Sequence, residues 1–453
     1  MVNTVSGNTK LLRIVPFSEV SFWDYKRFST IDINSKYPLE LLRNHIEERN
    51  DKIKPFESPD KIFKILGVNN KVGVFDSYDE YGKNINQPYK RVEDSDLAYN
   101  PYRVNVGSIG LKTENQKNQY ISPAYVVFSC KENLNAEFFY RLFKTDTFNR
   151  IVNENTTGSV RQNLKFDILQ SIKIPLPPLS EQNKLVEAYN KRIALASKQE
   201  EKAAQLEKEI ENYLFKELGL TKSKEIHKSK TLTFKQFKNI SIWGADRILR
   251  GGDSSILYSD KYENKKLSLL AQINPRTDLS NLKEEDNMSF IPMACVSDDY
   301  GEVMELRGGK KSESKGYTKF QDGDLIWARI TPCMQNGKSA IVQNLKNGLG
   351  YGSTEYHIVR KLSNEFSIEY TYTLLRTSLV RNDAVNYFTG SAGQQRVPKS
   401  YLEELEVPVP PLSVQNRIVN KINELKDQVK TLNNEALINR REAIKEFEKE
   451  IFS

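Results

Sequence analysis

The nine residues PLPPLSEQN that begin at Pro175 return, with two changes, as PVPPLSVQN from Pro408. Five further pairs of short matches precede this pair in the two halves of the chain. They keep the same order while their offset drifts from 220 to 233 positions, as loop insertions would produce. The pairs are Phe17–Arg27 with Phe237–Arg247, Leu39–Leu42 with Leu267–Leu270, Asp94–Leu97 with Asp322–Leu325, Tyr120–Tyr125 with Tyr351–Tyr356, and Thr157–Ser159 with Thr389–Ser391. Six collinear matches indicate a duplicated unit, so both halves should build the same fold.

The first part of each copy has the pattern of an α+β globular domain. Short runs rich in β-formers alternate with glycine and asparagine turns, as at Lys71–Phe75, Tyr125–Phe128 and Asp324–Ala328. Two short helical patterns cover Ala136–Phe148 and Ile368–Val380. We therefore expect two repeated domains that each contain short strands and a few short helices.

The second part of each copy has the pattern of one long helix. The prolines at 175, 177 and 178 favour extended backbone, and Ser180 follows where a helix N-cap belongs. Apolar residues then recur in steps of three and four, and a helix of about 37 residues would span roughly 55 Å. An amphipathic helix lying on its own domain is the alternative. The predicted seam residues are Leu185, Ile193, Leu206 and Ile210 in the first copy, and Ile418, Ile422, Leu425, Val429 and Leu432 in the second.

Connectivity predicts how the two long helices pair. The first helix can end at Gly219 and is followed by a short basic linker. If the seams meet, the second helix runs back along the first, which gives an antiparallel coiled coil with a pseudo-twofold axis. The predicted domains are 1–175 (target domain 1), 176–221 (helix 1), 222–236 (linker), 237–408 (target domain 2) and 409–453 (helix 2).

Composition excludes several classes of protein. Apolar stretches are all shorter than a membrane span requires, and no secretory signal is readable, so we expect a cytoplasmic protein. The three cysteines lie far apart and form no C-x-x-C pair, and there are three histidines. We therefore expect neither a disulfide framework nor a metal site.

Several segments come close to enzyme motifs without completing them. Asn100-Pro101-Tyr102 resembles the N-P-P-Y loop of amino-methyltransferases but lacks the second proline, and no glycine-rich loop for a methyl donor precedes it. Gly337-Lys338-Ser339 resembles the end of a P-loop without its first glycine. The aspartate pairs 94/96 and 322/324 could hold magnesium, although a turn leading into a strand explains them better. Glu355 and His357 alternate along a predicted strand. They could form a functional site or simply lie on a solvated face. We predict no catalytic residue.

Nucleic-acid binding fits the charge pattern better than catalysis. The net charge is +8, and basic residues alternate with aromatic and amide side chains in both domains. Lysine and arginine can neutralise phosphates, and arginine can also read base edges. Ordinary solvated loops are the alternative. The candidate DNA-binding residues are Lys83, Lys90, Arg91, Arg103 and Lys112 in the first domain, and Arg250, Lys310, Lys311, Lys315, Arg329 and Lys338 in the second.

These features together resemble the specificity (S) subunit of Type I restriction-modification systems. The resemblance rests on the duplication, on YNPYRVNVGSIG from Tyr99 and SPAYVVF from Ser122, on GSTEYH from Gly352, and on the proline-rich start of both helices. It covers essentially the whole chain. Two departures are Val414, where the family prefers an acidic residue, and Tyr102, where a smaller or thioether side chain is common.

The resemblance implies a non-catalytic subunit of a methyltransferase and endonuclease complex. Each domain would read one half of an asymmetric, bipartite DNA target, and the helices would set the gap and dock two modification (M) subunits. Those subunits would bind S-adenosylmethionine, and restriction (R) subunits would use ATP and Mg²⁺, so this chain would need no cofactor. A related system with fused cleavage and methylation subunits, a single-chain enzyme and a coiled-coil scaffold without DNA function are the alternatives.

Overall fold

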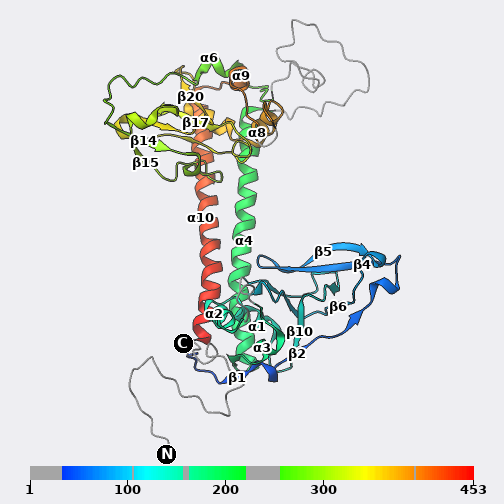
Figure 1. The fold of residues 1–453 in the computed structure, drawn as a ribbon. Coiled ribbons are helices and arrows are strands. Elements are labelled where there is room, and N and C mark those ends of the chain that lie inside the picture. Colours follow the sequence, from blue (N-terminus) through cyan, green and yellow to red (C-terminus); the bar gives the residue numbers. More distant parts are fainter. Residues whose placement is uncertain (1–32, 105–106, 157–162, 221–255, 392–393, 453) are drawn as a thin grey trace, which may run out of the picture. The chain divides into compact units, whose positions relative to one another are not determined.

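The computed structural model describes residues 33–104, 107–156, 163–220, 256–391 and 394–452. These residues form two compact units. Unit 1 comprises residues 1–199 and 434–453, and unit 2 comprises residues 200–433. Each unit therefore combines one globular domain with parts of both long helices (Figure 1).

The described residues of unit 1 form three sheets. A four-stranded sheet forms its centre, and an antiparallel two-stranded ribbon and a five-stranded sheet complete it. The strand orders are β2 (Ile46–Glu48), β10 (Val126–Cys130), β7 (Leu97–Tyr99), β8 (Ile109–Leu111) in the first; β1 (Leu39–Leu41), β11 (Lys173–Pro175) in the ribbon; and β3 (Lys52–Ile53), β6 (Tyr89–Arg91), β9 (Tyr120–Ile121), β4 (Ile62–Asn69), β5 (Gly73–Tyr81) in the last.

Unit 2 repeats this arrangement with one strand fewer. The strand orders are β13 (Ala271–Ile273), β20 (Tyr356–Lys361), β17 (Leu325–Ala328), β18 (Ser339–Ile341); β12 (Asn264–Lys266), β21 (Glu406–Pro408); and β15 (Arg307–Lys310), β14 (Asn287–Ile291), β19 (Leu349–Gly352), β16 (Thr318–Gln321). A parallel pairing recurs as well, as β4 with β9 and β14 with β19. The predicted duplication is therefore confirmed, and β3 is an addition to the first copy.

The central sheet of each unit is buried on both faces. Leu325 and Trp327 of β17 pack on the helical side, whereas Ile326 between them packs towards the other sheet. In β7, Leu97 and Tyr99 lie in one apolar cluster and Ala98 lies in another. Alternate residues of a strand point to opposite faces, so these strands can hold two layers together.

Short helices cover one side of each central sheet, and they differ from the prediction. The expected single helices are each split in two, α1 (Ala136–Leu142) with α2 (Asp146–Asn155), and α7 (Ile368–Leu375) with α8 (Ser378–Val385). Thr145 and Thr377 cause the break because their hydroxyls accept the amide protons of Phe148 and Val380 and so cap a new helix. Among the described residues, the other short α-helices are α3 (Phe166–Gln170), α6 (Leu267–Leu270) and α9 (Lys399–Glu404).

The two long helices are α4 (Leu179–Leu218) and α10 (Leu412–Ile451), each 40 residues long. The predicted N-cap at Ser180 is wrong, because α4 already begins at Leu179, directly after the prolines. α4 ends one residue before Gly219, as predicted. Gly219 has φ +63°, a conformation that glycine adopts easily.

A buried glutamine ties the start of each long helix to its domain. Gln182 Oε1 accepts from the amide of Asn135 at 2.8 Å, while its Nε2 donates to the carbonyls of Asn133 and Pro177. Gln415 repeats this pattern with Ser367, Glu365 and Pro410. Neither glutamine is exposed. The repeated proline–glutamine motif therefore forms the same connection between long helix and domain in both copies.

Within each unit the long helices run antiparallel, as predicted. In unit 1, Arg192 pairs with Glu446, and Gln199, two turns later in α4, pairs with Glu435, which lies earlier in α10. In unit 2 the last turns of α4 meet the first turns of α10, where Arg417 pairs with Glu217 at 2.8 Å. The helix ends also join the domain cores, for example Leu218 in unit 2 and Phe447 in unit 1.

The residues predicted to form the seam between the long helices are buried to different degrees. Ile418, Ile422, Leu425 and Val429 are buried, whereas Leu185, Ile193, Leu206, Ile210 and Leu432 are half-buried. Alanines at 196, 203, 436 and 443 are 2% exposed or less, which lets the backbones approach closely. One layer is polar, because Asn439 Nδ2 donates to Gln199 Oε1 at 3.0 Å.

Candidate nucleic-acid interface

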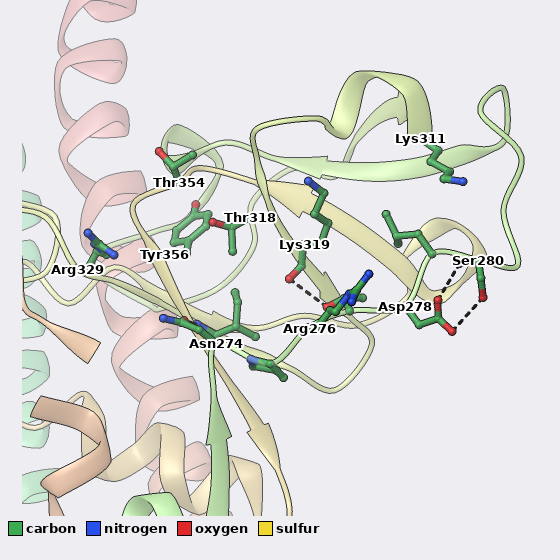
Figure 2. Close-up of a pocket in the computed structure, with 14 residues that line it drawn as sticks. Asn274, Arg276, Asp278, Ser280, Lys311, Thr318, Lys319, Arg329, Thr354 and Tyr356 are labelled. Atoms are coloured by element: carbon green, nitrogen blue, oxygen red, sulfur yellow. Dashed lines mark hydrogen bonds between the residues drawn. The ribbon is translucent and has the colours of Figure 1, made fainter. Parts of the chain in front are cut away.

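A polar groove of about 930 Å³ opens in the domain of unit 2 (Figure 2). The segment after β13, strand β16 and the start of β20 form its walls. This groove lies between the central sheet that contains β20 and the sheet that contains β16, so strands support the irregular segments that line it. Its polar lining includes Arg276, Asp278, Lys311, Thr318, Lys319, Arg329 and Thr354.

The lining of the groove is predominantly cationic. The lining contains four basic side chains and one carboxylate, that of Asp278. Hydrogen bonds from Ser280 lower the pKa of Asp278. Lys311 lies 3.1 Å from Glu284, whereas Lys319 donates to the carbonyl of Tyr317. Because positive charge exceeds negative charge here, the groove favours a polyanion.

Arg329 is positioned at one end of this groove by its backbone. Its amide donates to the Glu355 carbonyl at 2.9 Å, and its carbonyl accepts from Val397 at 2.8 Å. Its Nε lies 3.6 Å from Glu355 Oε2 and makes no hydrogen bond within the described part of the chain. Arg396 instead binds Glu355 with several short hydrogen bonds and lowers the pKa of that carboxyl. The guanidinium of Arg329 therefore lies half-buried beside the ion pair that Glu355 forms with Arg396.

A buried histidine supports the same end of the groove. His357 Nε2 lies 2.9 Å from the Val397 carbonyl, and Nδ1 lies 3.0 Å from Asn274 Nδ2. The carbonyl can only accept and the amide nitrogen can only donate, so the proton of the neutral ring belongs on Nε2. Burial lowers the pKa of His357 to about 4. His357 is thus a neutral structural residue, and neither a solvated face nor a charged site.

The predicted DNA-binding residues of the first domain separate into two groups. Lys83, Arg91 and Arg103 are exposed, although Arg91 pairs with Glu93 at 2.8 Å. Lys83 lies on the 3-10 turn η5 (Gly82–Asn84), over the ring of Tyr81. Lys90 and Lys112 are 6% and 5% exposed and pair with Glu48 and Asp94. Their contacts favour a structural role for these two lysines.

The second domain shows the same division. Lys315 is exposed, Lys310 pairs with Glu285 at 2.5 Å, and Lys311 and Arg329 line the groove. Lys338 instead donates to the carbonyls of Met293 and Val296, which ties two segments of the domain together. The predicted residue Arg250 lies outside the described residues.

Sequence reasoning missed Arg276 and did not select Lys319, although both line the groove. Lys319 ends the basic segment that begins at Arg307, so its signal was present. Arg276 stands in the segment Asn-Pro-Arg-Thr-Asp after β13 and had no basic neighbours to mark it. Only the fold brings this segment next to β16 and β20.

One aspartate of each predicted pair lies beside an arginine. Asp96 is buried beside Arg49 at 3.1 Å, and Asp324 is buried beside Arg360 at 2.7 Å. Each partner is an arginine of the same domain, which supports the turn interpretation. Across the described ranges, no cluster of three or more histidine, cysteine or acidic residues could hold a metal ion. No helix in these ranges is long and apolar enough to cross a membrane.

Comparison with known proteins identifies the class to which this duplicated fold belongs. The family model "Type I restriction modification DNA specificity domain" matches twice, over residues 69–208 and 259–440. The chain therefore belongs to this family and carries its domain in both halves. This agrees with the repeat found in the sequence and with the repeated sheets of units 1 and 2.

Particular relatives agree with the family. The specificity subunits of the Type I restriction enzymes EcoEI and EcoAI of Escherichia coli are 39% identical over 160 and 167 residues. These matches cover 35% and 37% of this chain but only 27% and 28% of the relatives. A solved chain from a structure of complex assembly and conformational transition of the type I R-M system has a TM-score of 0.57 at 15% identity, with 93% of this chain and 97% of that chain covered. That likeness shows a shared fold.

Proposed function

We propose that this chain is the DNA-binding specificity subunit of a Type I restriction-modification complex. Each repeated domain reads one half of an asymmetric, bipartite target. The observation that carries the proposal is the presence of two copies of a DNA specificity domain, each with its own exposed cations. Duplex DNA presents two successive binding sites to such a pair, and the spacing between protein domains sets the spacing between half-sites.

Different loops on the two copies support an asymmetric target. The hairpin connection between β4 and β5 is residues 70–72, whereas the equivalent connection between β14 and β15 is residues 292–306. Base edges are read by side chains that differ in type and position, so unlike loops read unlike sequences. The shared sheets hold both sets of loops in the same way.

The long helices support docking of two modification subunits. Leu179 and Leu412 begin α4 and α10 and are 43% and 41% exposed. These two leucines occupy equivalent positions in the two copies, and equivalent exposed apolar side chains suit two copies of one partner. In this proposal S-adenosylmethionine, ATP and Mg²⁺ act in partner subunits, and this chain takes no part in bond breaking.

Two alternatives give different results in simple experiments. A related system with fused cleavage and methylation subunits would show one partner polypeptide where a Type I complex shows separate modification and restriction subunits. A coiled-coil scaffold without DNA function would show no salt-dependent binding of duplex DNA. The cationic groove argues against the scaffold, because it predicts binding that weakens as salt concentration rises.

A domain exchange tests the proposal directly. Replacing residues 30–155 with the equivalent domain of another family member should change one half of the methylated target and leave the other half intact. The matched control replaces the equivalent region of the second copy and should change only the other half. Adenine methylation mapping reads both results. An exchange that alters both halves, or neither, would contradict the proposal.

A further inference from the structure

A long connection in the second copy reaches one of the long helices. In unit 2, residues 292–306 connect β14 to β15. This connection folds back on itself, because the Ser297 amide donates to the Glu302 carbonyl at 2.9 Å. Residues 298–302 lie at the turn of this small hairpin, and we call them the tip. The side chains that contact the tip come from α7 and α10.

The end of α7 holds the tip through backbone carbonyls. The Tyr372 hydroxyl donates to the Gly301 carbonyl at 2.9 Å. Arg376 Nη2 donates to the carbonyls of Asp298 and Asp299 at 3.0 and 3.1 Å. Gly301 has φ +67°, and a Cβ there would lie 2.2 Å from both Tyr372 Oη and Arg376 Nη1. Any other residue at 301 would strain the backbone and displace these two groups.

Two lysines of α10 contact the same structure from the other side. Lys430 Nζ lies 3.0 Å from Glu302 Oε2 and 5.2 Å from the centre of the Tyr300 ring. Lys426 Nζ lies 4.6 Å from the centre of the Tyr372 ring. An ammonium group over an aromatic ring is attracted by the negative face of the ring. The domain of unit 2 is therefore joined to the side of α10, about four turns from the first residue of that helix.

The first copy has neither the long connection nor the two lysines. Residues 70–72 connect β4 to β5 there. Counted from the first residue of each long helix, Lys426 corresponds to Ile193 of α4, and Lys430 corresponds to Ser197. The long connection and its two cationic partners thus occur together in one copy. This is expected if they act as one unit.

We infer that the tip, with Lys426 and Lys430, fixes the angle at which the second domain stands on α10. These are positioning residues, and the inference rests on the proposed function. The spacing between DNA-reading domains sets the spacing between half-sites. A domain held at one angle places its DNA-reading side chains at one position along the helix, so it permits one gap length. The contacts of the tip therefore restrict the gap and leave the choice of bases to other residues.

The test measures methylation by the full chain in complex with its modification subunit. The DNA targets have fixed half-sites and a gap that is original, one base pair shorter or one base pair longer. Tyr372→Phe with Lys430→Glu removes the hydroxyl that binds the tip and places a like charge opposite Glu302. This variant should methylate an altered gap about tenfold better, relative to the original gap, than the wild type does. Its base preference in both half-sites should stay unchanged.

A rescue variant and a control variant make the test specific. Adding Glu302→Lys to Tyr372→Phe with Lys430→Glu restores opposite charges and should narrow the accepted gap again. The control is Tyr140→Phe with Lys421→Glu. Tyr140 is the fifth residue of α1 as Tyr372 is of α7, and Lys421 pairs with Glu424 within α10. The control should accept only the original gap.

The outcomes separate this inference from the proposed function. If the wild-type complex methylates no bipartite sequence, the proposed function fails. If the wild type accepts one gap and Tyr372→Phe with Lys430→Glu accepts the same one, the inference is overturned. Equal loss of methylation at every gap would show that the tip only stabilises the domain, and would overturn it as well. Thermal unfolding checks that each variant is folded, and Lys430→Glu alone is judged by the same criterion if the double variant is not.

Discussion

At the scale of single residues, one buried amide in each copy joins a helix to a domain. Gln182 satisfies the carbonyls of Asn133 and Pro177 and the amide of Asn135 at once. Removing a hydrogen-bonding partner strands buried polar groups, which costs about 1–3 kcal/mol each. The local sequence could not reveal this role, because two of the three partners lie 47 and 49 residues away in the chain.

Gln182→Leu should therefore lower the free energy of unfolding by about 3 kcal/mol or more, since leucine fits the space but leaves three backbone groups unpaired. Urea unfolding followed by far-ultraviolet circular dichroism measures this loss of stability. Gln199→Leu is the matched control, because Gln199 is half-buried in the helix seam and joins no backbone carbonyl by a described hydrogen bond. Equal stability of Gln182→Leu and wild type would contradict this account.

His357 gives a second residue-scale prediction, in which pH is varied. Its folded pKa of about 4 lies below the ordinary value of 6.5, so the unfolded chain binds the proton more readily. The stability held by neutral His357 is complete above pH 6.5 and is lost progressively as pH falls towards 4. At pH 5.5 the loss should be about 1.4 kcal/mol.

Urea midpoints at pH 7.5 and 5.5 measure this loss, in a range where ordinary carboxylates stay ionised. His357→Gln can keep the donor to the Val397 carbonyl but cannot titrate. It should be less stable than wild type at pH 7.5 and should lose less stability than wild type on going to pH 5.5. The same pH sensitivity in both proteins would show that another group is responsible.

At the scale of elements, the helix pair carries one polar layer in an otherwise apolar seam. Gln199 and Asn439 bond to each other there, and Gln199 also donates to Glu435. A polar pair inside a seam specifies register at a cost in stability. The double variant Gln199→Leu with Asn439→Leu should therefore raise the melting temperature by a few degrees while it weakens the preference for one register.

Differential scanning calorimetry and cysteine cross-linking between the helices measure these two effects. The matched control is Leu206→Ala, which removes apolar contact from the same seam and should lower the melting temperature. A lower melting temperature in the double leucine variant would mean that the polar layer stabilises the pair and does not merely select its register.

The elements also show what could be predicted from sequence. The long helices and their antiparallel pairing followed from a periodicity that extends over 40 residues, where local capping matters little. The short helices did not, because the apolar pattern continued across Thr145 and Thr377 while their hydroxyls started new helices. The arginine partners of the buried aspartates could not be predicted for another reason. Asp96 pairs with Arg49 and Asp324 with Arg360, so equivalent aspartates take arginines from different strands or loops.

At the scale of the whole molecule, duplication explains both the fold and the proposed bipartite target. The repeat could be recognised in the sequence because the two copies keep short matching motifs in the same order. The groove was not, because it gathers Arg276, Lys319 and Arg329 from three separate segments. Strands that meet only in the folded domain bring these segments together.

If the helices set the gap, inserting one heptad into both α4 and α10 should lengthen it. Seven residues add roughly 10 Å of helix, about three base pairs, and keep the seam in phase. A heptad inserted into α4 alone is the control and should disturb pairing without giving a defined longer gap. Methylation mapping that returned the original gap from the double insertion would refute the helices as spacers.

The central claim is that two unlike readers in one chain recognise the two halves of one DNA target. Genome-wide mapping of methylated adenine in a host that expresses this chain with its modification subunit tests it most directly. The account predicts one motif with two different short halves, separated by a fixed number of unspecified base pairs, and no motif when this chain is omitted. A single uninterrupted motif, or methylation that persists without the chain, would contradict it.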